Sequence, residues 1–137
     1  MAYVSDHGPI DLGPGPEGFG EYHDAIMELT RGVDLLVHDA QYTVEEFGPK
    51  ANFGHSTADY AVGLGIRAGA GRLVLFHHDP FHDDAQLDRI LEHCRELGGQ
   101  ADLQIEAAVE GAVIEVRASP TPVHTPHPGP PWKGERG

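Results

Sequence analysis

The chain has 137 residues, which is enough for one domain. It carries 22 acidic against 9 basic side chains, a formal net charge of −13 with its 10 histidines neutral, so its surface should repel phosphate backbones and disfavour indiscriminate nucleic-acid binding. A single cysteine excludes a disulfide framework, and no apolar run approaches the roughly 20 residues of a membrane span. We therefore expect a cytoplasmic protein without a membrane segment.

The last residues differ in composition from the rest of the chain. The segment 119–137 contains six prolines and three glycines and almost nothing apolar, so burial cannot offset its ordering entropy. We expect residues 1–118 to form one domain and residues 119–137 to be a disordered tail.

The first half of the domain predicts two strands separated by a helix. A short strand over 2–5 leads into a loop rich in glycine and proline, and apolar residues at helical spacing over 22–29 precede Gly32, a typical helix end. The apolar run 33–38 then reads as a buried strand.

The second half continues the alternation. After a loop through 48–54 we expect a helix with Ser56 as its N-cap, a strand over 72–76, a helix capped by Asp83 and a β-hairpin over 103–116. This order predicts an α/β fold whose largely parallel sheet ends in an antiparallel pair.

Three predicted strands end in the same kinds of polar residue: Asp6-His7, His38-Asp39 and His77-His78. Because the carboxyl ends of parallel strands line the crevice where ligands bind, these side chains should converge, and His55 can join them. Imidazole and carboxylate groups are ligands for a divalent cation such as zinc. Any one of these pairs taken alone is equally consistent with a surface pair or a helix cap.

The remaining chemistry-bearing residues have simpler interpretations. Asp83 and Asp84 are better explained by helix capping than by catalysis, and Cys94 lies on the apolar stripe of a predicted helix, where a small buried residue is expected. We expect the other histidines to be exposed to solvent, namely His23, His82, His93, His124 and His127.

Four segments in order resemble a known family: "YVSDH", "DLLVHDAQY", "FGHSTADYAVGLGIRAG" and "RLVLFHHDP". They are similar to the carboxyl-terminal half of metallo-β-lactamase-fold hydrolases, nearest to the ribonuclease Z and phosphodiesterase branch, and the resemblance covers residues 2–117. It implies half of an αββα sandwich, with a mixed sheet flanked by helices. It also implies two divalent metal ions, zinc or manganese, which activate water for phosphodiester hydrolysis.

The resemblance implies a role for individual residues. Asp6 matches the aspartate that bridges the two metals, and His77 matches a terminal metal ligand. Asp39 matches an acidic residue that supports catalysis, and His55 matches the histidine that stabilises or protonates the leaving group. His7 and His78 depart from the family pattern, and either is a candidate for an additional or substitute ligand.

The family's H-x-H-x-D-H segment does not occur in this chain. Asp6 and His77 would then be the only side chains that bind the metals directly, so we expect weak metal binding by the chain alone. We also expect association with a partner half-domain or a second copy, or else poor stability. The resemblance implies a phosphodiester substrate, either RNA or a smaller nucleotide, and the acidic balance favours the smaller one. The alternative is a non-catalytic half-domain that binds a partner chain.

Overall fold

The computed structural model describes residues 1–5, 7–9, 20–50, 55–99 and 101–116. The expected tail at 119–137 and residue Asp6 lie outside these ranges. The elements, in chain order, are β1 (Ala2–Val4), α1 (Asp24–Thr30), β2 (Leu35–Asp39), α2 (Val44–Lys50), α3 (Ala58–Ala68), β3 (Arg72–Phe76), α4 (Asp84–Gly98) and β4 (Gln104–Ala107).

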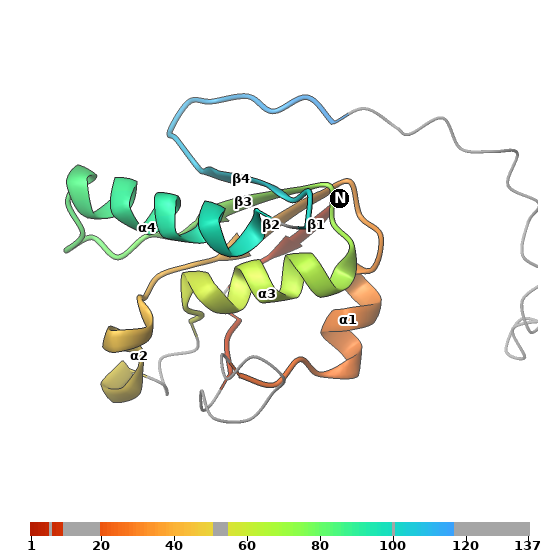
Figure 1. The fold of residues 1–137 in the computed structure, drawn as a ribbon, viewed down its shortest axis with the longest axis horizontal. Helices are drawn as coiled ribbons and strands as arrows, with labels where there is room; N and C mark the ends of the chain where they lie inside the picture. The colour runs from red at the N-terminus through yellow and green to blue at the C-terminus, as the bar shows by residue number, and fades with distance from the viewer. Residues whose placement is uncertain (6, 10–19, 51–54, 100, 117–137) are drawn as a thin grey trace, which may run out of the picture.

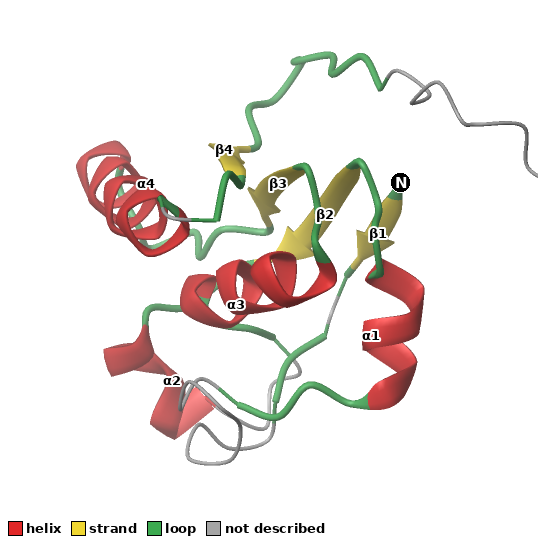
Figure 2. Cartoon of the chain, turned by 45° about the vertical axis from the view of Figure 1, so that its right-hand side comes forward, coloured by secondary structure: helices red, strands yellow, loops and turns green. Residues whose placement is uncertain are grey.

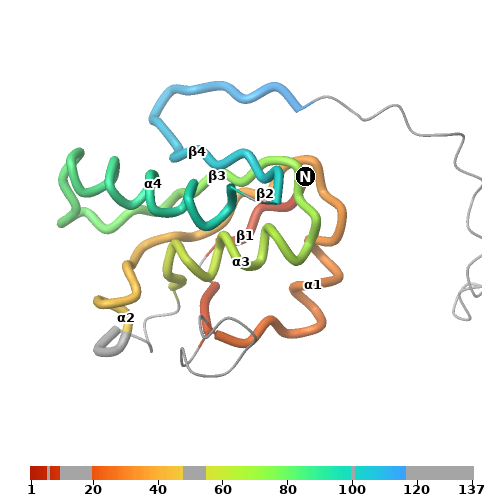
Figure 3. The backbone as a smooth tube through the Cα atoms, in the orientation of Figure 1, coloured from red at the N-terminus to blue at the C-terminus, as the bar shows by residue number. Residues whose placement is uncertain are grey.

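The four strands form one parallel sheet in the order β1-β2-β3-β4. Each connection leads to the next strand in the sheet, which runs parallel to the strand before it. Because such crossovers are right-handed and all proceed in the same order across the sheet, their helices lie on one face of it. Helices α1, α3 and α4 accordingly form a single layer with α3 in the middle (Figures 1 and 2). The smooth path of the chain in Figure 3 follows these crossovers from β1 to β4.

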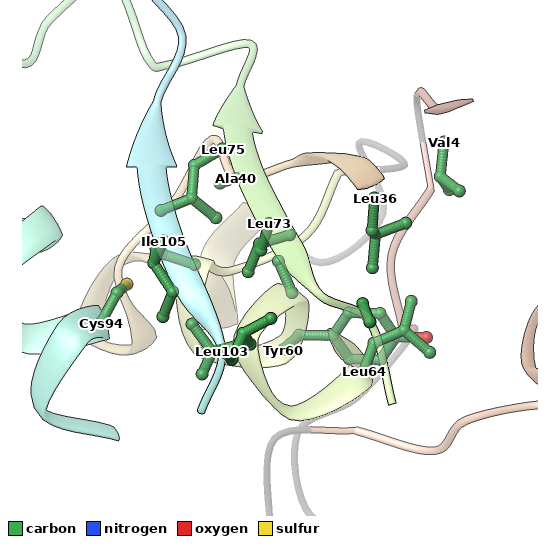
Figure 4. Close-up of a cluster of buried hydrophobic side chains, with 14 of the residues drawn as sticks. Val4, Leu36, Ala40, Tyr60, Leu64, Leu73, Leu75, Cys94, Leu103 and Ile105 are labelled. Atoms are coloured by element: carbon green, nitrogen blue, oxygen red, sulfur yellow. The ribbon is translucent and has the colours of Figure 1, made fainter. Parts of the chain in front are cut away.

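The hydrophobic core lies between this helical layer and the sheet. Strand register aligns Ala2, Leu36, Leu73 and Ile105 in one row across the four strands. These residues pack in one cluster with the buried face of α3. Figure 4 shows Leu73 near Tyr60 and Leu64, and Ile105 near Leu103 and Cys94. Burying each leucine or isoleucine side chain stabilises the fold by roughly 2 kcal/mol.

Helix boundaries follow local capping chemistry. Thr57, not the expected Ser56, is the N-cap of α3, because its side chain accepts a hydrogen bond from the Tyr60 N–H, and α3 ends at Gly69 in the left-handed conformation. Asp83 caps α4, as the sequence predicted, and forms a full capping box with Gln86. Cys94 on α4 is fully buried, also as predicted, and burial raises the pKa of its thiol to about 12.

Two further sequence-based expectations are wrong. Residues 112–116 form no strand, so the expected hairpin is absent and every strand pair among the described residues is parallel. Conversely, residues 48–50 were expected to belong to a loop, but they are the last residues of helix α2. Gly48 and Pro49 have low helix propensity, which is why this helix was not predicted. The Thr43 N–H and hydroxyl both donate to Glu46 Oε1 and fix the first turn of α2.

No helix in the described part of the chain combines the length and the apolar character needed to cross a bilayer.

Candidate metal-binding active site

Parallel pairing brings two of the expected site residues to neighbouring positions. Asp39 is the last residue of β2 and is in register with Phe76, the last residue of β3, so His77 follows immediately beside Asp39. His55 comes from a different part of the chain, two residues before the N-cap of α3. The carboxyl edge of the sheet and the start of α3 therefore meet at one place.

The Asp39 carboxylate is the centre of this site. Its Oδ2 accepts hydrogen bonds from His55 Nδ1 at 2.7 Å and His77 Nδ1 at 2.9 Å. Its Oδ1 accepts from the backbone N–H of Ser56 at 3.1 Å and of Gln41 at 3.4 Å. Asp39 is completely buried, and these four donors compensate for the loss of water around its charge.

These contacts determine the tautomer of both imidazole rings. A carboxylate only accepts hydrogen bonds, so Nδ1 of His55 and of His77 must each carry a proton, and the lone pair of each neutral ring is then on Nε2. A carboxylate behind a histidine is the usual arrangement for a metal-binding imidazole. Asp39, His55 and His77 each also offer a ligand atom, and these atoms lie within 4.8 Å of one another, so the same group could hold a divalent cation.

The two rings differ in exposure. The side chain of His55 is 15% exposed and that of His77 is 43% exposed, and the rings meet edge to face with centroids 4.6 Å apart. The backbone of His77 has φ of 61°, a left-handed conformation that side-chain-bearing residues rarely adopt. The exposed ring with its Nε2 lone pair fits a metal ligand, and the less exposed ring fits a donor to substrate.

The other candidate histidines surround this cluster. His7 Nε2 lies 3.0 Å from the Tyr60 hydroxyl, and burial lowers the pKa of His7. The fully buried His38 donates from Nδ1 to its neighbour's carbonyl, the Asp39 O, and burial lowers the pKa of His38 to about 4. Burial likewise lowers the pKa of His78. Of the four residues expected at the site, three converge and Asp6 lies outside the described residues.

One expectation about the remaining histidines is wrong. The side chain of His82 is only 3% exposed, and its Nε2 lies 2.9 Å from Glu46 Oε1. His23 is exposed, and His93 is 53% exposed while contacting Asp59 Oδ2 at 2.8 Å. His124 and His127 lie outside the described ranges. The contact between Glu46 and His82 was not predicted, because helix α2, which carries Glu46, was not predicted. The capping pattern "TVEE" at 43–46 is the sequence signal for the start of this helix.

Comparison with known proteins gives a consistent set of relatives. The chain is 33% identical over 86 residues to ribonuclease BN of Escherichia coli O1:K1, an alignment covering 63% of this chain and 28% of that enzyme. It is 32% identical over 74 residues to ribonuclease BN of the E. coli Crooks strain, covering 54% of this chain and 24% of the enzyme. The chain thus spans about a quarter of the length of these relatives. No protein-family model matches the sequence.

Among solved structures, the chain matches the metallo-β-lactamase fold protein YhfI from Bacillus subtilis with a TM-score of 0.55 and 23% identity. The match covers 69% of this chain and 36% of that structure.

Proposed function

We propose that this chain, which has the metallo-β-lactamase fold, supplies the carboxyl-terminal part of a metal-dependent phosphodiesterase site. The fold itself follows from the similarity to YhfI and agrees with the family resemblance of the sequence. The observation that carries the proposal is the Asp39 carboxylate, which receives the Nδ1 protons of both His55 and His77.

In this proposal His77 binds the metal through Nε2 while Asp39 holds its ring from behind. When bound, a divalent ion, zinc or manganese, supplies Lewis acidity and an activated water to the site. Asp6 is proposed as a further ligand on the family resemblance alone. His77 and Asp6 are too few for a closed coordination shell, so we propose that other segments, of the same protein or of a partner subunit, complete it.

His55 acts on the substrate in this proposal. In its protonated form, the Nδ1–H is held by Asp39 and the Nε2–H is the donor to the departing oxygen of the phosphodiester. Asp39 stabilises the resulting positive ring through the 2.7 Å contact. Asp39 is one methylene shorter than the glutamate usual in the family, and the short contacts to both rings support the view that an aspartate suffices here.

The substrate class rests on two opposing considerations. The relatives are named as ribonucleases, which favours a nucleic-acid phosphodiester. The net charge of −13 opposes long polyanions and favours a small nucleotide, because repulsion grows with each phosphate brought near the surface. We propose a small phosphodiester as the substrate and RNA as the competing one.

His55→Ala tests the proposed roles. We expect hydrolysis of bis(para-nitrophenyl) phosphate to fall by roughly 10²-fold or more while bound metal is unchanged, because His55 acts as a proton donor. His77→Ala should instead lower bound metal together with activity. His93→Ala is the matched control, since it removes another histidine that contacts an aspartate, and it should change neither. Loss of metal from His55→Ala would show that the two roles are assigned wrongly.

The alternative function is a non-catalytic half-domain that binds a partner chain. It is favoured by the exposed Tyr3, 60% accessible on the sheet face that faces away from the helical layer. A chain that binds a partner tightly but hydrolyses no phosphodiester with zinc or manganese, alone or in the complex, would support this alternative over the enzyme.

A further inference from the structure

A second group of metal-ligating side chains shares no residue with the Asp39 site. Glu46 on α2, together with Asp79 and His82 in the connection between β3 and α4, each offer a ligand atom, and these atoms all lie within 4.8 Å of one another. We propose that Glu46, Asp79 and His82 form an additional site for a divalent transition-metal ion such as zinc.

The three residues combine the ligand types that such an ion prefers. Two carboxylates and one imidazole match borderline cations, and they converge from two separate parts of the chain. Their net charge is −1 even when the imidazole is protonated. Asp79 is 4% exposed and the His82 side chain 3%, whereas the Glu46 side chain is 32% exposed, so a cation there would be partly shielded from solvent and screened less than one on an open surface.

The negative charge of the cluster also affects its surroundings. The pKa of Tyr42 is raised, first by burial and then by the nearby carboxylates of Asp79, Asp39 and Glu46. For Glu46 itself, burial opposes ionisation, but hydrogen bonds from Thr43 and His82 outweigh it and lower the pKa.

Hydrogen bonding within the described residues leaves His82 incompletely satisfied. Its Nε2 lies almost equally far from both Glu46 oxygens, at 2.9 and 3.0 Å, a position from which one N–H makes two bent bonds. Its buried Nδ1 has no hydrogen-bond partner among the described residues. A divalent cation bound to Nε2 would displace the proton that His82 donates to Glu46.

A bound ion would have a mechanical consequence. Asp79 and His82 belong to the segment that begins at His77, and Glu46 belongs to α2. The ion would tie α2 to this segment and limit the freedom of His77, so the additional site would act as a structural support for the proposed active site.

Zinc binding to the full chain tests this inference without depending on hydrolysis. In a His55→Ala/His77→Ala background, which removes the imidazoles of the Asp39 site, equilibrium dialysis with metal analysis should still find one zinc ion per chain. Adding Glu46→Gln or His82→Ala should weaken this binding by roughly tenfold or more. Adding His93→Ala should leave it unchanged, because that histidine contacts Asp59 and not this cluster.

Thermal unfolding distinguishes a metal site from a simple ion pair. If the cluster binds zinc, adding zinc to the background variant should raise its Tm, and Glu46→Gln should abolish that increase. If it is only an ion pair between Glu46 and His82, Glu46→Gln will lower Tm equally in zinc and in chelator. That result, or a background variant that binds no zinc, would overturn the inference while leaving the proposed role of the Asp39 site untouched.

Discussion

The backbone of His77 combines an unfavourable conformation with a chemically useful position. Its φ of 61° costs a residue with a Cβ on the order of 1 to 2 kcal/mol, and the cost occurs where the ring contacts Asp39. Strained backbone persists only where surrounding contacts compensate for it, and it is concentrated at functional sites.

A glycine at this position should therefore be better tolerated than an alanine. His77→Gly and His77→Ala both remove the imidazole, but only glycine relieves the left-handed conformation. We expect His77→Gly to have a free energy of unfolding about 1 kcal/mol above that of His77→Ala in urea denaturation. Equal stability of the two variants would mean that the conformation at residue 77 is not strained.

Buried His38 makes stability depend on pH. Burial lowers its folded-state pKa to about 4 from a usual 6.5, so between these values the unfolded chain binds a proton that the folded chain excludes. The free energy of unfolding should therefore fall as pH drops from about 6.5 toward 4, by up to about 3 kcal/mol from this residue. His38→Leu should flatten the dependence measured by urea unfolding, and His23→Leu, at an exposed position, should not.

Among the elements, the start of α3 is held against the loop that follows β1 by close backbone packing. A Cβ added to Gly8 would lie 2.1 Å from the His55 carbonyl oxygen, closer than any real contact. The Ser56 hydroxyl donates to the His7 carbonyl and joins the same two segments. The position of His55 relative to Asp39 thus depends on Gly8, which has no side chain and lies in the loop after β1.

Gly8→Ala should displace the segment that carries His55. We expect a loss of stability on the order of 1 to 3 kcal/mol and a fall in phosphodiester hydrolysis in an active preparation, measured by urea unfolding and by steady-state rates. Gly99→Ala is the control, because Gly99 at the end of α4 has φ of −61°, which suits any residue. If Gly8→Ala behaves like the control, the packing at residue 55 must be looser than described.

For the molecule as a whole, the most informative feature is that its described helices α1, α3 and α4 cover one face of the sheet (Figure 2). On the other face, register aligns Tyr3, Val37 and Val74 in one row, and the rings of Tyr3 and Phe76 lie 5.1 Å apart. In this row Tyr3 is 60% exposed whereas Val74 is 2% exposed, so the exposed apolar surface lies at the β1 edge. Exposed apolar surface of this kind is a typical site of association.

We expect this face to associate with a second copy of the chain or with a partner domain. Tyr3→Glu should then weaken association in sedimentation velocity across a concentration series, because a charge would be buried in the contact. Phe81→Glu is the matched control, since Phe81 is 89% exposed but lies beyond β3 in the connection to α4. A chain that is monomeric at every concentration and unfolds cooperatively would contradict the expectation.

Local signals predicted most of the elements. The apolar runs predicted β1, β2 and β3 to within two residues, and Asp83 marked the start of α4. The failures have local causes as well. Gly48 and Pro49 concealed α2, and the alternating residues 112–116 have a strand pattern but no neighbouring strand to pair with among the described residues.

The placement of Asp39 and His77 at the same edge of the sheet could be predicted from the residues alone, because buried apolar runs end immediately before them and parallel strands share their carboxyl ends. Folding in three dimensions was needed to show that His55 and His77 donate to the same oxygen of Asp39, and that His82 is buried against Glu46. The reason is physical: periodicity fixes which face or end a residue occupies, whereas hydrogen bonds depend on packing between segments that are distant in the chain.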